Sequence, residues 1–397
     1  MRASGVGQLL QLLRDGVPRT KAEIVELTGL SRSTVSSRVD TLVGLGLVGP
    51  AGEAASSGGR PPARIAFLPS SRVVLAIDLG ATHGTVALTD LAGTLLDHRT
   101  AELDIADGPD AVLDWATRTG LELLRASGRP ATDLIGVGVG VPGPVEHSTG
   151  RPINPPIMPG WDRFDVPGRI RGTFDVPVLV DNDVNILALG EHATAWPDAA
   201  DLVFVKVSTG IGAGIVSSGV LQRGAQGSAG DLGHVHVPWH PGTERSPEDD
   251  RDLEEIASGP AIATLLRERG VPALSSTDVV TLVRQGNREA ADLVRQAGRE
   301  IGAVLASLVN LLNPSVIVIG GSIARAGEQL IAGVRETVYR RSIPLATQHL
   351  TIVQSRSDET AGVTGAAIMV IQDVLSPGSP TWDAVRASPP PVRALRS

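Results

Sequence analysis

The 397-residue sequence predicts an α/β protein in which a small N-terminal domain of three helices and two strands precedes two larger α/β lobes. Three observations support this prediction. Apolar residues recur at helical spacing between Val6 and Val48, and after Val73 they form the continuous runs that strands buried on both faces require. The length itself favours two or three domains, because one domain ordinarily holds about 100–200 residues.

The composition excludes several classes of protein. The chain contains no cysteine, so it has no disulfide, iron–sulfur cluster, thiolate nucleophile or cysteine-bound zinc. Apolar stretches such as Leu134 to Val145 are interrupted by Gly and Pro and are shorter than the roughly 20 residues of a membrane span. The first 16 residues also lack the core and cleavage site of a signal peptide. We therefore expect a cytoplasmic protein without membrane contact.

The first two helices are predicted from their apolar spacing and their ends. Asp15 and Gly16 end the first helix, and Thr20 is placed to cap the second with Glu23 in the capping-box position. The apolar faces of these helices are expected to consist of Leu9, Leu10, Leu12, Leu13, Ile24, Val25 and Leu27.

A third helix is expected from Arg32 to Leu45, after a turn at Gly29 and a cap at Ser31. Its inward residues are predicted to be Val35, Val39, Leu42 and Val43. A helix, a tight glycine turn and a second helix of this size form a helix-turn-helix.

Two strands with a loop between them predict a wing after this motif. Leu47-Val48 and Ala63–Phe67 are the strands, and Gly49 to Pro62 form a loop with Arg60 near its tip. Residues 1–70 hold eight Arg and Lys against five Asp and Glu, although the whole chain carries a net charge of −8. These features favour contact with the DNA major groove and backbone; the alternative is a small helical bundle with polar faces. The residues expected to contact DNA are Arg32, Ser33, Thr34, Ser36, Ser37, Arg38 and Arg60.

From residue 73 onward, two predicted apolar strands are each followed directly by a glycine-rich hairpin. Val73–Ile77 leads into Asp78–Thr82, and Leu202–Val207 leads into Ser208–Gly214. Such hairpins let backbone amides approach phosphate, and two of them predict two related lobes that face each other across a cleft.

In this order and spacing the segments resemble the ROK family, which joins sugar kinases to sugar-responsive repressors within the actin/hexokinase-like ATPase fold. The glycine-rich stretch from Gly212 to His234 resembles the family signature, and Val316–Gly321 resembles the strand and turn beside the adenosine. The resemblance implies a winged helix-turn-helix domain at 1–68, a first lobe at 73–181 completed by 313–372, and a second lobe at 182–312. The proline-rich segment 376–397 is expected to be a disordered tail.

The resemblance also assigns a sugar site and a nucleotide site. Asp183 falls on the catalytic base, and this type of side chain at a strand end suits the deprotonation of a sugar hydroxyl; the alternative is a carboxylate that only caps a loop. Asn182, Asp183, Asp231, His234 and Glu254 fall on sugar-binding positions, with Asp231 where the family usually has Glu. The nucleotide and phosphate positions are Asp78, Gly80, Thr82, Thr209, Gly210, Gly212, Gly320 and Gly321.

Family members commonly bind zinc through a histidine and three cysteines. With Leu253-Glu254 setting the register, the cysteine positions hold Arg245, Pro247 and Asp252. His234 and His236 would alternate along an expected strand and point to opposite faces, which argues against shared ligation. We therefore expect no zinc and no other metal ligand set.

Two hypotheses follow for function. The first is a sugar-responsive transcriptional regulator, expected to be a repressor of carbohydrate metabolism, that binds double-stranded operator DNA and a sugar or sugar-phosphate effector as a homodimer or homotetramer. The alternative is an ATP-dependent sugar kinase with an appended DNA-binding domain, which would use ATP and Mg²⁺ and act through Asp183. Ala81, Ser208 and Ser322 stand where such kinases commonly carry other residues.

Overall fold

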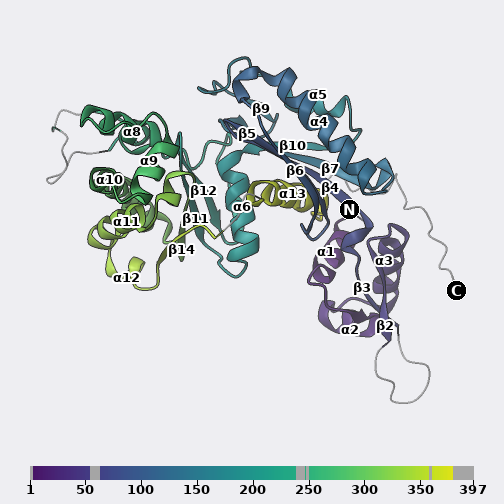
Figure 1. Ribbon diagram of the computed structural model, residues 1–397. Coiled ribbons are helices and arrows are strands. Elements are labelled where there is room, and N and C mark those ends of the chain that lie inside the picture. Colours follow the sequence, from purple (N-terminus) through teal and green to yellow (C-terminus); the bar gives the residue numbers. More distant parts are fainter. Residues whose placement is uncertain (1–2, 54–62, 238–245, 247–249, 357–359, 379–397) are drawn as a thin grey trace. The chain divides into compact units, whose positions relative to one another are not determined.

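The structure, a computed structural model, describes residues 3–53, 63–237, 246, 250–356 and 360–378, and the chain divides into two compact units (Figure 1). Unit 1 comprises Met1–Gly143, Thr149–Asp181 and Gly362–Ser397, and unit 2 comprises Pro144–Ser148 and Asn182–Ala361.

The N-terminal part of unit 1 is a three-helix domain with a small sheet. Its elements are α1 (Ala3–Leu13), β1 (Arg19–Thr20), α2 (Lys21–Thr28), α3 (Arg32–Gly44), β2 (Val48–Glu53) and β3 (Ala63–Phe67), with strand order β1-β3-β2. The predicted caps are confirmed: Thr20 and Glu23 form a capping box, Gly29 ends α2 in the left-handed region, and the Ser31 side chain accepts a hydrogen bond from the Thr34 amide.

Some predictions for this domain were wrong. Leu27 and Val43 are 60% and 46% exposed, because each lies outside the narrow buried stripe of its short helix. Strand β2 continues to Glu53 beyond the expected start of the loop, and β1 was not predicted because it has only two residues. The wing tip with Arg60 and the segment 379–397 lie outside the described residues.

The larger part of unit 1 is a five-stranded sheet with order β10-β7-β4-β5-β6. Strand β4 runs parallel to β7 and antiparallel to β5, and helices cover both faces. A Cβ on Gly120 of α4 would meet Leu75, whereas one on Gly138 of β7 would meet the backbone of Ala366 in α13. The elements are β4 (Val73–Leu79), β5 (His83–Asp90), β6 (Leu95–Glu102), α4 (Pro109–Ala126), β7 (Leu134–Val141), β9 (Arg151–Pro152), α5 (Val166–Arg171), β10 (Val178–Asn182) and α13 (Ala361–Val374).

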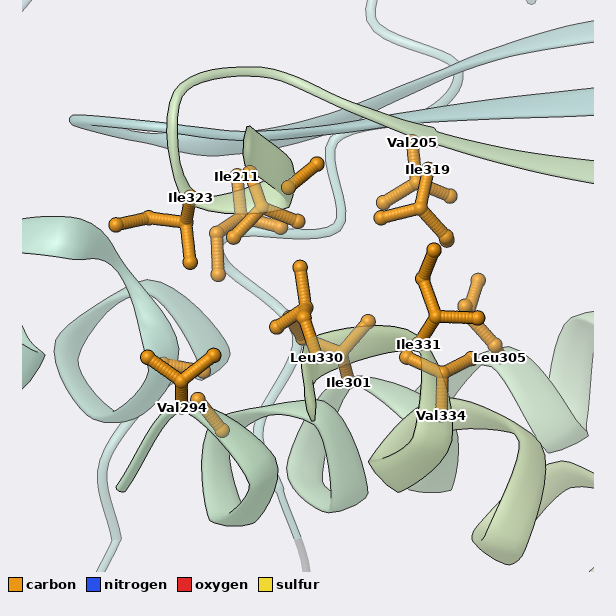
Figure 2. Close-up of a cluster of buried hydrophobic side chains, with 14 of the residues drawn as sticks. Val205, Ile211, Val294, Ile301, Leu305, Ile319, Ile323, Leu330, Ile331 and Val334 are labelled. Carbon is orange, nitrogen blue, oxygen red and sulfur yellow. The ribbon is translucent and has the colours of Figure 1, made fainter. Parts of the chain in front are cut away.

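Unit 2 contains a second five-stranded sheet, with order β13-β12-β11-β14-β15. Alternate residues of β11, namely Val203, Val205 and Val207, belong to the core shared with the long helices, part of which Figure 2 shows. Helix α6 packs on the opposite face, where a Cβ on Gly214 would collide with Ala188. The elements are β8 (Val145–Glu146), α6 (Asp183–Ala195), β11 (Leu202–Val207), β12 (Ile211–Ser217), β13 (Val220–Gln222), α7 (Leu253–Ala257), α8 (Gly259–Glu268), α9 (Ser276–Arg284), α10 (Arg288–Leu312), β14 (Val316–Gly320), α11 (Glu328–Arg341), α12 (Pro344–Thr347) and β15 (Thr351–Gln354).

Helices α10 and α11 pack closely because glycines line their contact. A Cβ on Gly302 of α10 would lie 2.8 Å from the carbonyl oxygen of Val334, and one on Gly298 would be closer still to that of Leu330. Figure 2 shows Ile301 and Leu305 of α10 beside Leu330, Ile331 and Val334 of α11, below Val205 and Ile319 of the sheet. Among the described residues, every helix is too short or too polar to traverse a lipid bilayer.

Candidate functional site

The predicted base Asp183 is the first residue of α6, directly after strand β10. Asn182 caps this helix, since its Oδ1 accepts a hydrogen bond of 2.8 Å from the amide of Val184. The Asp183 side chain is only 8% exposed. The predicted sugar ligand Asn182 and the predicted base are thus placed by one short strand-to-helix junction.

Lys206 of β11 forms an ion pair with Asp183, its Nζ donating to Oδ2 of the carboxylate. Lys206 lies on the face of β11 opposite the core valines, and its cross-strand neighbours on both sides are glycines, Gly212 and Gly320. The neighbouring strands therefore present no side chain beside it. Sequence reasoning missed this residue, although a charged side chain inside the apolar strand 202–207 is a visible signal.

Asp231 and His234 form a second ionisable pair. Nδ1 of His234 lies 2.9 Å from Oδ1 of Asp231 and 3.1 Å from Oδ2. This hydrogen bond and the charge of Asp231 raise the pKa of His234 above its usual value. Both side chains are exposed, at 46% for Asp231 and 68% for His234, so the structure leaves them accessible to a ligand.

Glu254 supports the second glycine hairpin. Its Oε2 accepts a hydrogen bond of 2.9 Å from the amide of Ile211, and it would lie 2.7 Å from a Cβ on Gly210. Gly233 packs against the same side chain. The sugar ligand predicted at Glu254 is therefore joined to the hairpin that carries Gly210 and Gly212.

The remaining predicted phosphate positions of unit 2 surround the end of β14. Gly321 has φ of 89°, and its turn lies against the backbone of Val207 at the end of β11. Ser208 and Ser322 are joined by a hydrogen bond of 2.9 Å between their hydroxyls, and Thr209 is exposed. The structure thus brings the hairpin at 208–212 and the turn at 320–322 together.

The first predicted phosphate hairpin lies in unit 1, at the end of β4. The amide of Gly80 donates to the carbonyl of His83 over 2.8 Å, and Thr82 is exposed at the tip. The carboxylate of Asp78 faces the first turn of α13, where a Cβ on Gly362 would collide with it. A carboxylate beside a helix N-terminus is favourably placed, because the helix dipole is positive there.

Helix α3 presents part of its predicted DNA-contacting face to solvent. Arg32, Ser33 and Ser37 are exposed. The hydroxyls of Ser33 and Thr34 each pair with that of the cap Ser31, and Ser36 accepts a hydrogen bond of 2.9 Å from Nζ of Lys21. The Arg38 guanidinium lies against Gly5 of α1. The other three predicted positions of α3, Thr34, Ser36 and Arg38, are partly buried and contact neighbouring residues of the same domain.

The zinc that the family resemblance implies does not fit the residues present. His234 lies in a turn closed by the bond from the Val235 amide to the Leu232 carbonyl, so the expected strand through His234 and His236 was wrong. His236 pairs with Asp250, and the side chain of Asp252 caps α7 in a capping box. Among the described residues, no three potential ligands are grouped for a metal. Arg245 and Pro247 lie outside those residues.

Comparison with known proteins assigns the two parts of the chain. The ROK family profile matches residues 74–373, and that of the IclR helix-turn-helix domain matches residues 6–50. The chain is 27% identical over 393 residues to the xylose repressor of Caldicellulosiruptor bescii, covering 93% of this chain and 95% of that protein. It is 30% identical over 318 residues to the glucokinase of Thermotoga maritima, covering 75% and 96%.

A solved structure resembles almost the whole chain. It is described as a ROK family transcriptional regulator homologous to the E. coli MLC protein, and it matches with a TM-score of 0.81 and 25% identity over 97% of this chain and 99% of that one. The chain therefore belongs to the ROK family and carries an N-terminal helix-turn-helix domain in addition.

Proposed function

We propose that this protein is a sugar-responsive DNA-binding repressor of carbohydrate metabolism. One observation carries the proposal: a helix-turn-helix domain and a ROK domain occur in one chain and align together with a protein named a xylose repressor, over nearly the full length of both. ROK kinases such as the Thermotoga maritima glucokinase align with only the larger part of this chain.

On the DNA side, α3 is the element proposed to enter the major groove. Arg32, Ser33 and Ser37 are exposed on it, and the Lys21 ammonium beside Ser36 is paired with Asp40 of the same helix. Arg60 is proposed to reach phosphate or the minor groove from the wing. Because one short helix reads few base pairs, we propose that a homodimer or homotetramer binds two half-sites in the cytoplasm.

On the effector side, the proposed ligand is a sugar or sugar phosphate held by Asn182, Asp231, His234 and Glu254. Carboxylate, amide and imidazole groups match the alternating donors and acceptors of a sugar ring. The effector changes operator affinity only if it binds the DNA-competent and DNA-incompetent forms unequally. A coupling of about 1–3 kcal/mol would change operator affinity about 5–150-fold.

Genomic footprinting of the full-length protein, followed by a sugar screen on the recovered operator, tests this proposal. We expect discrete protected sites near genes of carbohydrate metabolism, and at least one sugar or sugar phosphate that shifts the binding curve. Absence of any sequence-specific protection would contradict the proposal.

Replacing Arg32 with Ala tests the proposed DNA-binding helix. If Arg32 contacts a phosphate, operator affinity falls and the slope of log affinity against log salt becomes shallower by about 0.9. Arg118→Ala on α4 is the matched control, since this exposed arginine lies outside the helix-turn-helix domain. Equal affinities and slopes for the two variants would reject the assignment of α3 as the DNA-binding helix.

A second candidate function is phosphorylation of a sugar by ATP. The position of Asp183 at the N-terminus of α6, beside Asn182, favours it. The exposed Thr209 and the glycine turn at Gly320-Gly321 fit a nucleotide, and ATP with Mg²⁺ would supply the phosphoryl group there. Formation of sugar phosphate by the purified protein, with no specific DNA retained, would make this the principal activity.

A further inference from the structure

We propose that Lys206 is a positioning residue that holds Asp183 in an ion pair and so prevents the ROK domain from phosphorylating the sugar it binds. This inference rests on the proposed function, because it concerns the same sugar site. It explains how a domain shared with sugar kinases can act as a receptor for its ligand without consuming it.

The ion pair joins two packed elements, with Asp183 on α6 and Lys206 on β11. Asp183 is fixed as the first residue of α6, and α6 packs on the sheet face from which Lys206 projects. Gly212 and Gly320 flank Lys206 in register, so the two neighbouring strands place no side chain directly opposite it. The acid is 8% exposed and the amine 24% exposed, so neither charge is fully hydrated. A largely buried carboxylate requires a partner of this kind.

Phosphoryl transfer requires Asp183 to accept a proton from the sugar hydroxyl, and the ion pair with Lys206 opposes this. The reaction forms a bond between the sugar hydroxyl oxygen and the γ-phosphorus of ATP, breaks the bond from that phosphorus to the oxygen that leaves on ADP, and releases the hydroxyl proton to a base. The base must lie within hydrogen-bond reach of that hydroxyl and be free to accept the proton. In this structure Oδ2 of Asp183 already accepts a hydrogen bond from the ammonium of Lys206, which also fixes the direction of the carboxylate.

Sugar binding, unlike phosphoryl transfer, does not require Asp183 to accept a proton. Asp231 and His234 are exposed and pair with each other, and the cap residue Asn182 is partly exposed. These groups can bind hydroxyls while Asp183 remains paired with Lys206. The arrangement therefore separates binding from transfer.

The test compares sugar phosphate formation by four full-length proteins: wild type, Lys206→Met, Lys206→Arg and the double variant Lys206→Met/Asp183→Asn. Each is incubated with ATP, Mg²⁺ and D-xylose, D-glucose or N-acetyl-D-glucosamine, and the product is measured by mass spectrometry. Met is unbranched and one atom shorter than Lys and removes the charge, whereas Arg restores a cation. We expect Lys206→Met to form sugar phosphate about 10²-fold faster than wild type, the lower end of what a general base contributes. The Arg variant should return to the low rate, and the double variant should lose the gain.

Equal rates for wild type and Lys206→Met would overturn the proposal, as would a gain that persists in the double variant. A melting curve checks that each variant folds, and Lys206→Gln replaces Lys206→Met if the latter does not. Calorimetry measures sugar binding by each variant. If Lys206→Met loses sugar binding and gains no turnover, Lys206 contacts the ligand and the proposal is wrong. Genomic footprinting tests the repressor function and does not depend on these rates, so the repressor function and the role of Lys206 are tested separately.

Discussion

The close contact between α10 and α11 predicts that Gly302→Ala destabilises unit 2. The new Cβ would lie 2.8 Å from the Val334 carbonyl oxygen and 2.9 Å from Cβ of Thr337, whereas ordinary contact begins at 3.4 Å. The helices must therefore separate by about 0.6 Å where their backbones meet. Because the obstacle is backbone rather than a flexible side chain, the cost of overpacking is at the upper end of the usual range, about 2–3 kcal/mol, and the better helix propensity of Ala offsets about 1 kcal/mol of it.

The expected net loss is about 1–2 kcal/mol, which corresponds to about 3–6 °C in Tm for a unit of this size. Scanning calorimetry of the full-length protein measures this shift. Gly298→Ala should lower Tm further, because its Cβ would come closer to the backbone of α11. Ser307→Ala, on an exposed position of the same helix, is the control and should change Tm little. A Gly302→Ala protein as stable as this control would refute the reasoning from helix contact.

Two pH dependences follow from the ionisable pairs. The pKa of His234 is raised by its hydrogen bond to Asp231, so the pair contributes fully below the usual histidine pKa of 6.5 and is lost as pH rises through the raised value. Asp231→Asn should therefore shift the His234 titration, followed by NMR, to lower pH, and an unchanged midpoint would exclude the pair. In the helix-turn-helix domain, the hydrogen bond from Arg19 lowers the pKa of Asp15 to about 2. Its contribution is complete above the ordinary value of 3.8 and is lost as pH falls through about 2, so Asp15→Asn should lower Tm at pH 6 and lower it much less at pH 2.

The elements that the sequence predicted well are those with strong local signals. The capping box at Thr20 and the apolar strand 202–207 agree with the structure because hydrogen-bonding side chains and a continuous apolar run specify them locally. Strand β6 was missed because it is a mostly exposed edge strand, and its polar sequence from Leu95 to Glu102 has no apolar run. Local periodicity carries no information about such a strand.

The site was predictable as a set of residue types but not as a set of contacts. Asp183 and Asn182 are adjacent in sequence, so their shared junction could be foreseen. The ion pair to Lys206 depends on the register of β11 with two neighbouring strands and on the packing of α6, which only the fold specifies. The role of Asp252 as a helix cap likewise depends on where α7 begins.

Helix α13 connects the predicted phosphate hairpin of unit 1 with the helix-turn-helix domain. Its first turn contacts Asp78 beside this hairpin, and just beyond its other end the carbonyl of Leu375 accepts a hydrogen bond of 2.7 Å from the Gln11 side chain of α1. This helix has 14 residues and is therefore about 21 Å long. An axial displacement of α13 would therefore move the backbone carbonyl to which Gln11 of the helix-turn-helix domain is bonded.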